Sequence, residues 1–150
     1  MTLDPSVFKA YDVRGTYPDQ IDEEGARRVG AAFVQVTSAR RVAVGHDART
    51  MAPSMCDAFI DGAVAAGAEV TGLGLLATEM LYFAVADGGF DAGATITASH
   101  NPPGYIGAKL VRAGAVPLSG ESGIAEVGRI ATAGGPDAGE RAAAHADPDL

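Results

Sequence analysis

Residues 94–111 read ATITASHNPPGYIGAKLV, two strand-like runs joined by a proline-rich turn. The first run, Gly93–Ala98, is short, apolar and partly β-branched, which is typical of a buried strand. Only about eight residues separate it from the second run, Gly107–Arg112. A parallel crossover needs a dozen residues or more. We therefore predict that the second strand runs antiparallel to the first.

Two earlier runs, Arg41–Gly45 and Glu69–Gly74, also predict buried strands, and a helical pattern precedes each of the first three strands. The first helix is capped by Asp22, the second runs from about Pro53 to Gly67, and the third begins at Thr78. Alternating helices and strands indicate crossovers in a parallel sheet. We expect an α/β fold in three layers, α/β/α, with a mixed four-stranded sheet of order 2-1-3-4 whose last strand is antiparallel.

The length of 150 residues and the apolar fraction of 47% fit one domain with a sizeable core. A weak helix around Ile124 and Ile130 would close a domain of residues 1–133. Residues 134–150, GGPDAGERAAAHADPDL, have no apolar periodicity. This composition predicts a linker toward a second domain.

The net charge of −8 and the single cysteine restrict the partners and the compartment. Nucleic-acid binding needs clustered Lys and Arg, so we expect no nucleic-acid partner. No apolar run could span a bilayer and no leader is recognisable, so we expect no membrane partner and a cytoplasmic location. Cys56 can form no internal disulfide, and its apolar neighbours predict a buried, structural thiol.

Ser99 follows a buried strand directly, at the end where ligands sit in open α/β sheets. A serine needs a base or a cation to act as a nucleophile; His100 is adjacent, and Lys109 comes ten residues later on the returning strand. The alternative is that Ser-His-Asn-Pro is simply a turn, and composition leaves both open. A Ser-His-Asp hydrolase is disfavoured because no G-x-S-x-G elbow is present.

Two further segments combine cations with turn residues. FKAYDVRG, residues 8–15, holds Tyr11 and Arg14, and the planar guanidinium fork suits phosphate. Its alternative is an edge strand with solvated charges. GHDARTMAPSM follows the first predicted strand, and there Asp47 and Arg49 could form a site or only a local ion pair. A metal-dependent hydrolase is disfavoured, because no spaced set of His and carboxylate ligands exists.

Taken together and in this order, YDVRG, GHDAR, ATEMLYFA, TASHNP and YIGAK resemble the first domain of the α-D-phosphohexomutases, the phosphomannomutases and phosphoglucomutases. The resemblance covers residues 8–112 and is greatest to an actinobacterial phosphomannomutase-like branch. The chain differs from the usual family pattern at His46, Glu79 and Ile106.

This resemblance implies that Ser99 is a phosphoserine and that Lys109 is a general acid or base. His100 would be the neighbour of Ser99 in the phosphoserine loop. Arg14 and Tyr11 would orient Ser99 and line the substrate cleft. A phosphate oxygen on Ser99 would be a ligand of Mg²⁺.

The implied reaction interconverts hexose 6-phosphate and hexose 1-phosphate, of mannose, glucose or both, through a hexose 1,6-bisphosphate that also acts as activator. The family's metal loop, sugar-selecting loop and terminal phosphate-binding domain have no counterpart here. We therefore expect the remaining domains of a parent chain as partners, besides the phosphosugar, and no activity in isolation. A phosphoglucosamine mutase domain and a non-catalytic binding module remain as alternatives.

Overall fold

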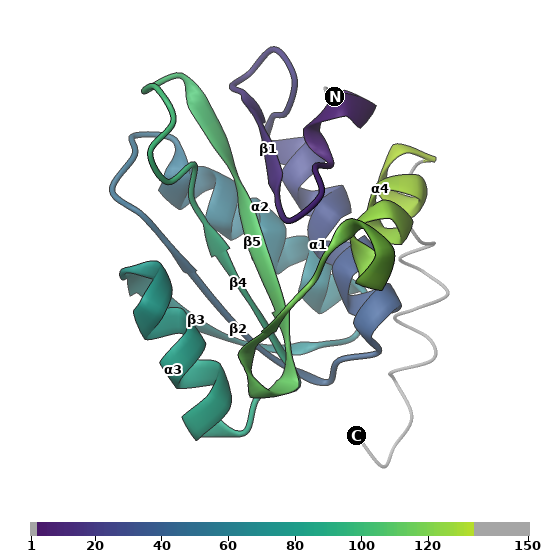
Figure 1. Cartoon of the computed structure of the whole chain (residues 1–150), viewed down its shortest axis with the longest axis vertical. Coiled ribbons are helices and arrows are strands. Elements are labelled where there is room, and N and C mark those ends of the chain that lie inside the picture. Colours follow the sequence, from purple (N-terminus) through teal and green to yellow (C-terminus); the bar gives the residue numbers. More distant parts are fainter. Residues whose placement is uncertain (1–2, 134–150) are drawn as a thin grey trace.

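The computed structural model describes residues 3–133, which form one sheet with helices on both of its faces (Figure 1). The predicted linker, residues 134–150, lies outside the described residues. The longer helices are α1 (Glu23–Thr37), α2 (Ala52–Ala65), α3 (Thr78–Gly88) and α4 (Ala125–Thr132), and the short helical turns are η1 (Pro5–Val7), η2 (Ala113–Ala115) and η3 (Gly120–Ile124). The strands are β1 (Val13–Thr16), β2 (Arg41–His46), β3 (Glu69–Leu75), β4 (Ala92–Ile96), β5 (Tyr105–Arg112) and β6 (Val116–Pro117).

The strands are ordered β1-β5-β4-β2-β3, and β6 pairs with β5. β2 is parallel to both of its neighbours, whereas β5 is antiparallel to β4, β1 and β6. The order 2-1-3-4 of the four predicted strands and the antiparallel fourth strand are therefore confirmed. The count of four strands is wrong, because the sheet has six. β1 reads only VRGT, and β6 has two exposed residues, one of them proline, so neither matches the apolar pattern of a buried strand.

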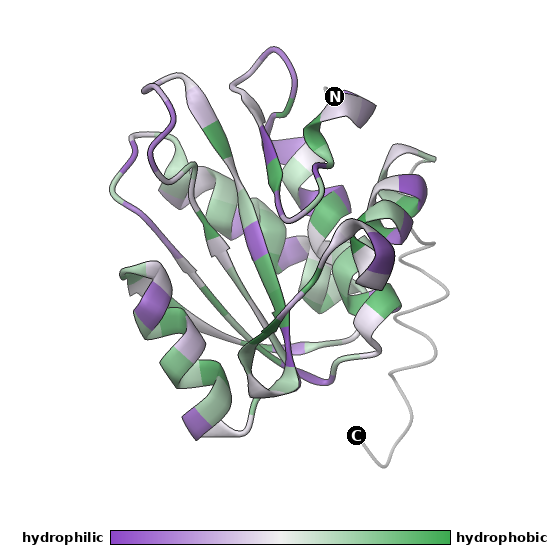
Figure 2. Cartoon of the chain, in the orientation of Figure 1, coloured by the Kyte–Doolittle hydropathy of each residue, from purple (hydrophilic) through white to green (hydrophobic). Residues whose placement is uncertain are grey.

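The three-layer arrangement follows from which side chains each face of the sheet buries. α1, α2 and α4 pack with alternate residues of the strands in one large core, whose strand residues include Val42, Val44, Ile96 and Leu110. α3 covers the other face, where Leu81 and Val85 pack against Ala43 and Val111. The loops that follow β2 and β4, at the upper left in Figure 2, are mainly hydrophilic. Polar residues therefore gather at that edge of the sheet.

The N-terminus of α1 is fixed as the sequence predicts. The carboxylate of Asp22 accepts a hydrogen bond from the amide of Gly25 at 2.9 Å, and Glu23 and Glu24 occupy the first turn. Acidic groups at this position interact favourably with the helix dipole. The predicted cap is confirmed.

Cys56 is 4% exposed, and burial raises the pKa of its thiol to about 11. A thiol with such a pKa is almost wholly protonated near neutral pH, so it is a poor nucleophile. The predicted buried, structural role is in line with this. No helix within residues 3–133 is long and apolar enough to cross a membrane.

α1 and α2 approach so closely that glycine is required at the contact. A Cβ built on Gly62 would lie 1.8 Å from the carbonyl oxygen of Arg27, and one on Gly30 would lie 2.1 Å from that of Phe59. The rings of Phe33 and Phe59 also meet between the helices, with centroids 6.0 Å apart. Two helix backbones in contact cannot yield without moving a whole helix.

Gly62→Ala should therefore destabilise the domain. Alanine is intrinsically better in a helix than glycine by about 1 kcal/mol, but the clash with backbone should outweigh this gain and leave a net loss of roughly 2 kcal/mol. Urea unfolding measures the difference. Gly72→Ala is the control, because a Cβ on Gly72 would make only an ordinary van der Waals contact, 3.8 Å from a methyl group of Ile60. An unchanged or increased stability of Gly62→Ala would contradict the close contact.

Candidate active site

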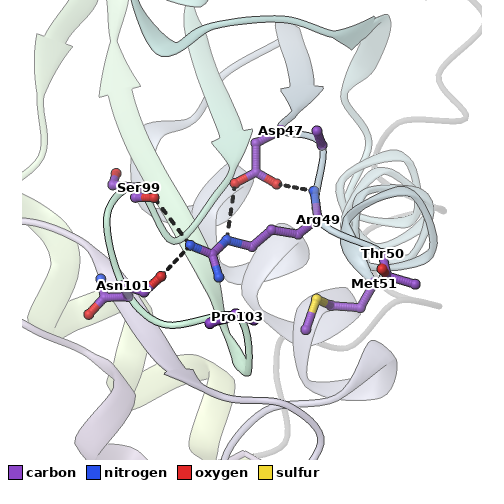
Figure 3. Close-up of a pocket in the computed structure, with 8 residues that line it drawn as sticks. Asp47, Arg49, Thr50, Met51, Ser99, Asn101 and Pro103 are labelled. Atoms are coloured by element: carbon purple, nitrogen blue, oxygen red, sulfur yellow. Dashed lines mark hydrogen bonds and ion pairs between the residues drawn. The ribbon is translucent and has the colours of Figure 1, made fainter.

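The loops after β2 and β4 lie side by side at one edge of the sheet. β2 and β4 are parallel neighbours, so their carboxyl ends meet there. The amide of Asp47 donates to the carbonyl of Ile96 at 2.9 Å, which joins the two loops at their base. They enclose a cleft of about 540 Å³ (Figure 3), lined by Asp47, Ala48, Arg49, Thr50, Met51, Ser99, Asn101 and Pro103.

Ser99 lies at the rim of this cleft, exposed to solvent and in an unusual backbone conformation. Its φ of 55° is in the left-handed region, which a residue with a side chain seldom adopts. The amide of Ser99 donates to the hydroxyl of Thr97 at 3.0 Å. The loop therefore holds Ser99 in one defined orientation, as a reactive group requires.

The guanidinium of Arg49 forms hydrogen bonds with main-chain oxygens of the same loop (Figure 3). Its Nη1 donates to the carbonyl oxygens of Pro102 at 2.7 Å and Tyr105 at 3.3 Å. Its Nη2 donates to those of Asn101 at 2.6 Å and Ser99 at 3.2 Å. One side chain thus binds four main-chain oxygens between residues 99 and 105.

Asp47 connects Arg49 with the strand that presents Ser99. One carboxylate oxygen accepts from the hydroxyl of Thr97 at 2.8 Å and lies 3.5 Å from Nε of Arg49. The other accepts from the amide of Arg49 at 3.0 Å. The ion pair that we considered as an alternative is present, and it also supports the Ser99 loop.

Arg14 and Lys109 point to the same face of the sheet. Arg14 of β1 is opposite Gly107 of β5, and Lys109 is two residues further along β5. Side chains at such positions share a face, and it is the face on which Val111 packs against α3. Within residues 3–133 neither cation has a hydrogen bond or an ion pair. Two unpaired cations on one face of an acidic chain favour an anionic ligand.

Tyr11 is not part of this face. It lies in the turn before β1, and its side chain is 77% exposed. The amide of Lys9 donates to the carbonyl of Asp12 at 2.8 Å and closes the turn. The pKa of Tyr82 in α3 is raised, first by burial and then by the negative charges of Glu79 and Asp12.

His100 is exposed next to Ser99. Within the described residues its imidazole has no hydrogen bond. The structure thus brings Ser99 together with Asp47 and Arg49. It forms no hydrogen bond between Ser99 and any of the other predicted site residues, which are His100, Lys109, Arg14 and Tyr11.

The model of the phosphoglucomutase/phosphomannomutase alpha/beta/alpha domain I matches residues 5–134. The chain belongs to this family. It is 42% identical over 127 residues to a phosphomannomutase of Salmonella typhimurium, an alignment that covers 85% of this chain and 28% of that protein. It is 41% identical to a phosphomannomutase sequence of Klebsiella pneumoniae, over 83% of this chain and 79% of that sequence.

A solved phosphoglucomutase/phosphomannomutase family protein from Burkholderia thailandensis has the same fold. Its TM-score is 0.80 at 34% identity, over 88% of this chain and 31% of that protein. The chain therefore spans about a third of that structure, as it spans 28% of the Salmonella protein.

Sequence reasoning left open whether Asp47 and Arg49 belong to the site, and it did not consider Thr97. The GHDAR segment carried a usable signal, because it follows the strand that neighbours the serine strand in the predicted order. Ile106, one of the three departures from the family pattern, is an interior residue of the domain. Its side chain is fully buried in β5, opposite Gly15.

A magnesium ion does not fit the described residues by themselves. Within residues 3–133 no group of three or more His, Cys, Asp or Glu side chains could hold a metal ion. Asp47 is the carboxylate beside Ser99, and both of its oxygens already accept hydrogen bonds. A metal near Ser99 would need ligands from elsewhere.

Thr97→Val should destabilise the domain by roughly 1–3 kcal/mol, because it removes a hydrogen bond to the Asp47 carboxylate and leaves the amide of Ser99 without a partner. Thr95→Val is the matched control, two residues earlier in β4. The hydroxyl of Thr95 is buried without a partner within residues 3–133, so its removal should be neutral or stabilising. Urea unfolding of both variants measures the difference. Equal losses would show that the Asp47–Thr97 contact contributes little.

Proposed function

We propose that this chain is the phosphoserine-bearing domain of a phosphohexomutase, which interconverts hexose 6-phosphate and hexose 1-phosphate through a hexose 1,6-bisphosphate. The observation that carries the proposal is the conformation of Ser99. It is exposed at the carboxyl end of β4 and held in the left-handed region by Thr97 and Arg49. Its place in a domain I of the phosphoglucomutase/phosphomannomutase family supports the same role.

In the proposed reaction Ser99 carries the phosphoryl group between the two ends of the sugar. A sugar hydroxyl attacks the phosphorus on Ser99, the bond from phosphorus to the serine oxygen breaks, and a bisphosphate forms. The serine oxygen then attacks the phosphorus at the other end of the sugar, and the bond from phosphorus to that sugar oxygen breaks. Such transfer depends mainly on positioning and on neutralising charge.

Lys109 is the proposed general acid or base, which takes the proton of the attacking hydroxyl and returns one to the leaving oxygen. His100 would assist from the loop. Arg14 and Tyr11 would orient the substrate, whose phosphate carries a charge of about −2. The unpaired state of Arg14 and Lys109, on one face of a chain with a net charge of −8, supports this assignment.

The sugar and the metal are further parts of the proposal. Relatives named phosphomannomutase support mannose phosphates as substrates, with glucose phosphates as a second possibility. We propose that Mg²⁺ binds a phosphate oxygen on Ser99 together with ligands from other domains. The domain would then be inactive in isolation. The cytoplasmic location stays a prediction.

A chimera tests the role of Ser99. Residues 1–133 replace the matching domain of the Salmonella phosphomannomutase, and turnover is measured with mannose, glucose and glucosamine 1-phosphates. Mannose 1-phosphate should be converted, and Ser99→Ala should lower kcat by roughly a thousandfold or more, because the phosphoryl carrier is lost. Ser38→Ala is the control, since Ser38 is also exposed and left-handed, with a φ of 54°, but it precedes β2 and so lies at the opposite edge of the sheet. Full activity of the Ser99→Ala chimera would refute the proposal.

Intact-mass measurement provides a second test that needs no turnover. The chimera treated with glucose 1,6-bisphosphate should gain one phosphoryl group, and Ser99→Ala should gain none. A wild-type protein that never gains this mass would favour a non-catalytic binding module. The 150-residue chain by itself should convert none of the three sugar phosphates.

A further inference from the structure

Arg49 fixes the direction of several peptide groups in the Ser99 loop, which is more than a single hydrogen bond would do. The carbonyl oxygens of Ser99, Asn101, Pro102 and Tyr105 all turn toward its guanidinium. In a trans peptide the C=O and N–H bonds point in opposite directions. Any N–H that follows one of these carbonyls must therefore point away from Arg49.

Of the four nitrogens that follow these carbonyls, only one is a free donor of the loop. Pro102 and Pro103 have no N–H, and Ile106 lies within β5. The remaining nitrogen is that of His100. Within residues 3–133 its N–H has no hydrogen-bond partner, whereas the amides of Ser99 and Asn101 donate to Thr97 and to the carbonyl of Ala98.

The hydroxyl of Ser99 lies on the side to which this N–H points. In Figure 3 the carbonyl of Ser99 is turned toward Arg49 and its side-chain oxygen is turned away. A phosphoryl group on that oxygen would be separated from the N–H of the next residue by only a few bonds. Phosphate oxygens and main-chain amides form charge-assisted hydrogen bonds that are roughly twice as strong as neutral ones.

We propose that the main-chain amide of His100 donates a hydrogen bond to the phosphoryl group on Ser99, and that Arg49 is the positioning residue that orients the Ser99–His100 peptide for this contact. The inference rests on the proposed function, since it requires phosphorylation of Ser99. It assigns the main chain of His100, rather than its imidazole, to the phosphate.

Arg49 acts through the loop and does not itself bind the substrate. Its Nη1 and Nη2 donate to the four carbonyl oxygens, and its Nε faces Asp47 at 3.5 Å. The negative carboxylate also offsets the guanidinium charge next to Ser99. Arg49 therefore has little donor capacity left for a phosphosugar, in contrast to the unpaired Arg14 and Lys109.

The test compares the 150-residue chain with serine and with genetically encoded phosphoserine at position 99. Exchange of the His100 amide with water is measured by NMR, together with the pKa of the phosphate by its phosphorus signal. In the wild-type chain phosphorylation should slow this exchange by roughly tenfold or more, and amides elsewhere in the loop should change less. In the Arg49→Lys chain most of this slowing should disappear and the pKa of the phosphate should rise, because a lysine cannot bind four carbonyl oxygens from a planar fork.

Arg112→Lys is the matched control. Arg112 also donates from Nη2 to a main-chain carbonyl, that of Ser122, but in a loop remote from Ser99. This variant should keep the wild-type slowing of His100. Thermal unfolding of the wild-type, Arg49→Lys and Arg112→Lys chains separates a reoriented Ser99–His100 peptide from a general loss of stability. Arg49→Gln provides a second substitution at the same position.

Two outcomes would overturn the inference. If the His100 amide exchanges equally fast in the serine and phosphoserine forms of the wild-type chain, it does not donate a hydrogen bond to the phosphoryl group. Wild-type slowing in a folded Arg49→Lys chain, or loss of folding in both Arg49 variants, would assign Arg49 a purely structural role. Neither outcome bears on the carrier role of Ser99, which the chimera tests, so the two proposals fail separately.

Discussion

The short return from β4 to β5 is the constraint on which the rest of the structure depends. The chain reverses within residues 97–104, so β5 must pair antiparallel with β4 and no helix can lie between them. The reversal occurs at the edge where β2 also ends. Asp47 and Arg49, which follow β2, are thereby placed under the loop that carries Ser99. The antiparallel direction of β5 also lets β1 pair on its other side, which brings Arg14 to the face of Lys109.

Much of the fold could be predicted because the core leaves a periodic trace in the sequence. The strands β2 to β5 and three of the helices are defined by apolar runs or stripes whose period matches their geometry. The prediction that the Glu69–Gly74 strand is buried is wrong, because β3 lies at the edge of the sheet and none of its residues is buried. β1 leaves no such trace, because it combines an arginine and a glycine with a single large apolar residue. Its position depends on β5, where a Cβ on Gly107 would lie 1.8 Å from the carbonyl oxygen of Val13. A contact between two backbones cannot be inferred from the hydrophobicity of either segment.

The site could be predicted only in part, for a related reason. Ser99 was singled out because a buried strand ends next to it, and the chemistry proposed for it came from the resemblance of the motifs to a family. The role of Arg49 could not be found in the same way. Its partners are main-chain oxygens, which every residue possesses, so the identities of the loop residues do not reveal the contact. The shared face of Arg14 and Lys109 likewise depends on the β1–β5 register.

The left-handed backbone conformation of Ser99 costs free energy, and this cost falls on the folding of the domain. Holding a residue with a side chain in this region costs of order 1–3 kcal/mol, and here Thr97 and Arg49 supply that free energy when the domain folds. In the proposed reaction, a mobile loop would lose the corresponding conformational entropy in every turnover. A loop that is already ordered loses it only once, during folding, and the stability of the folded domain is lower as a result.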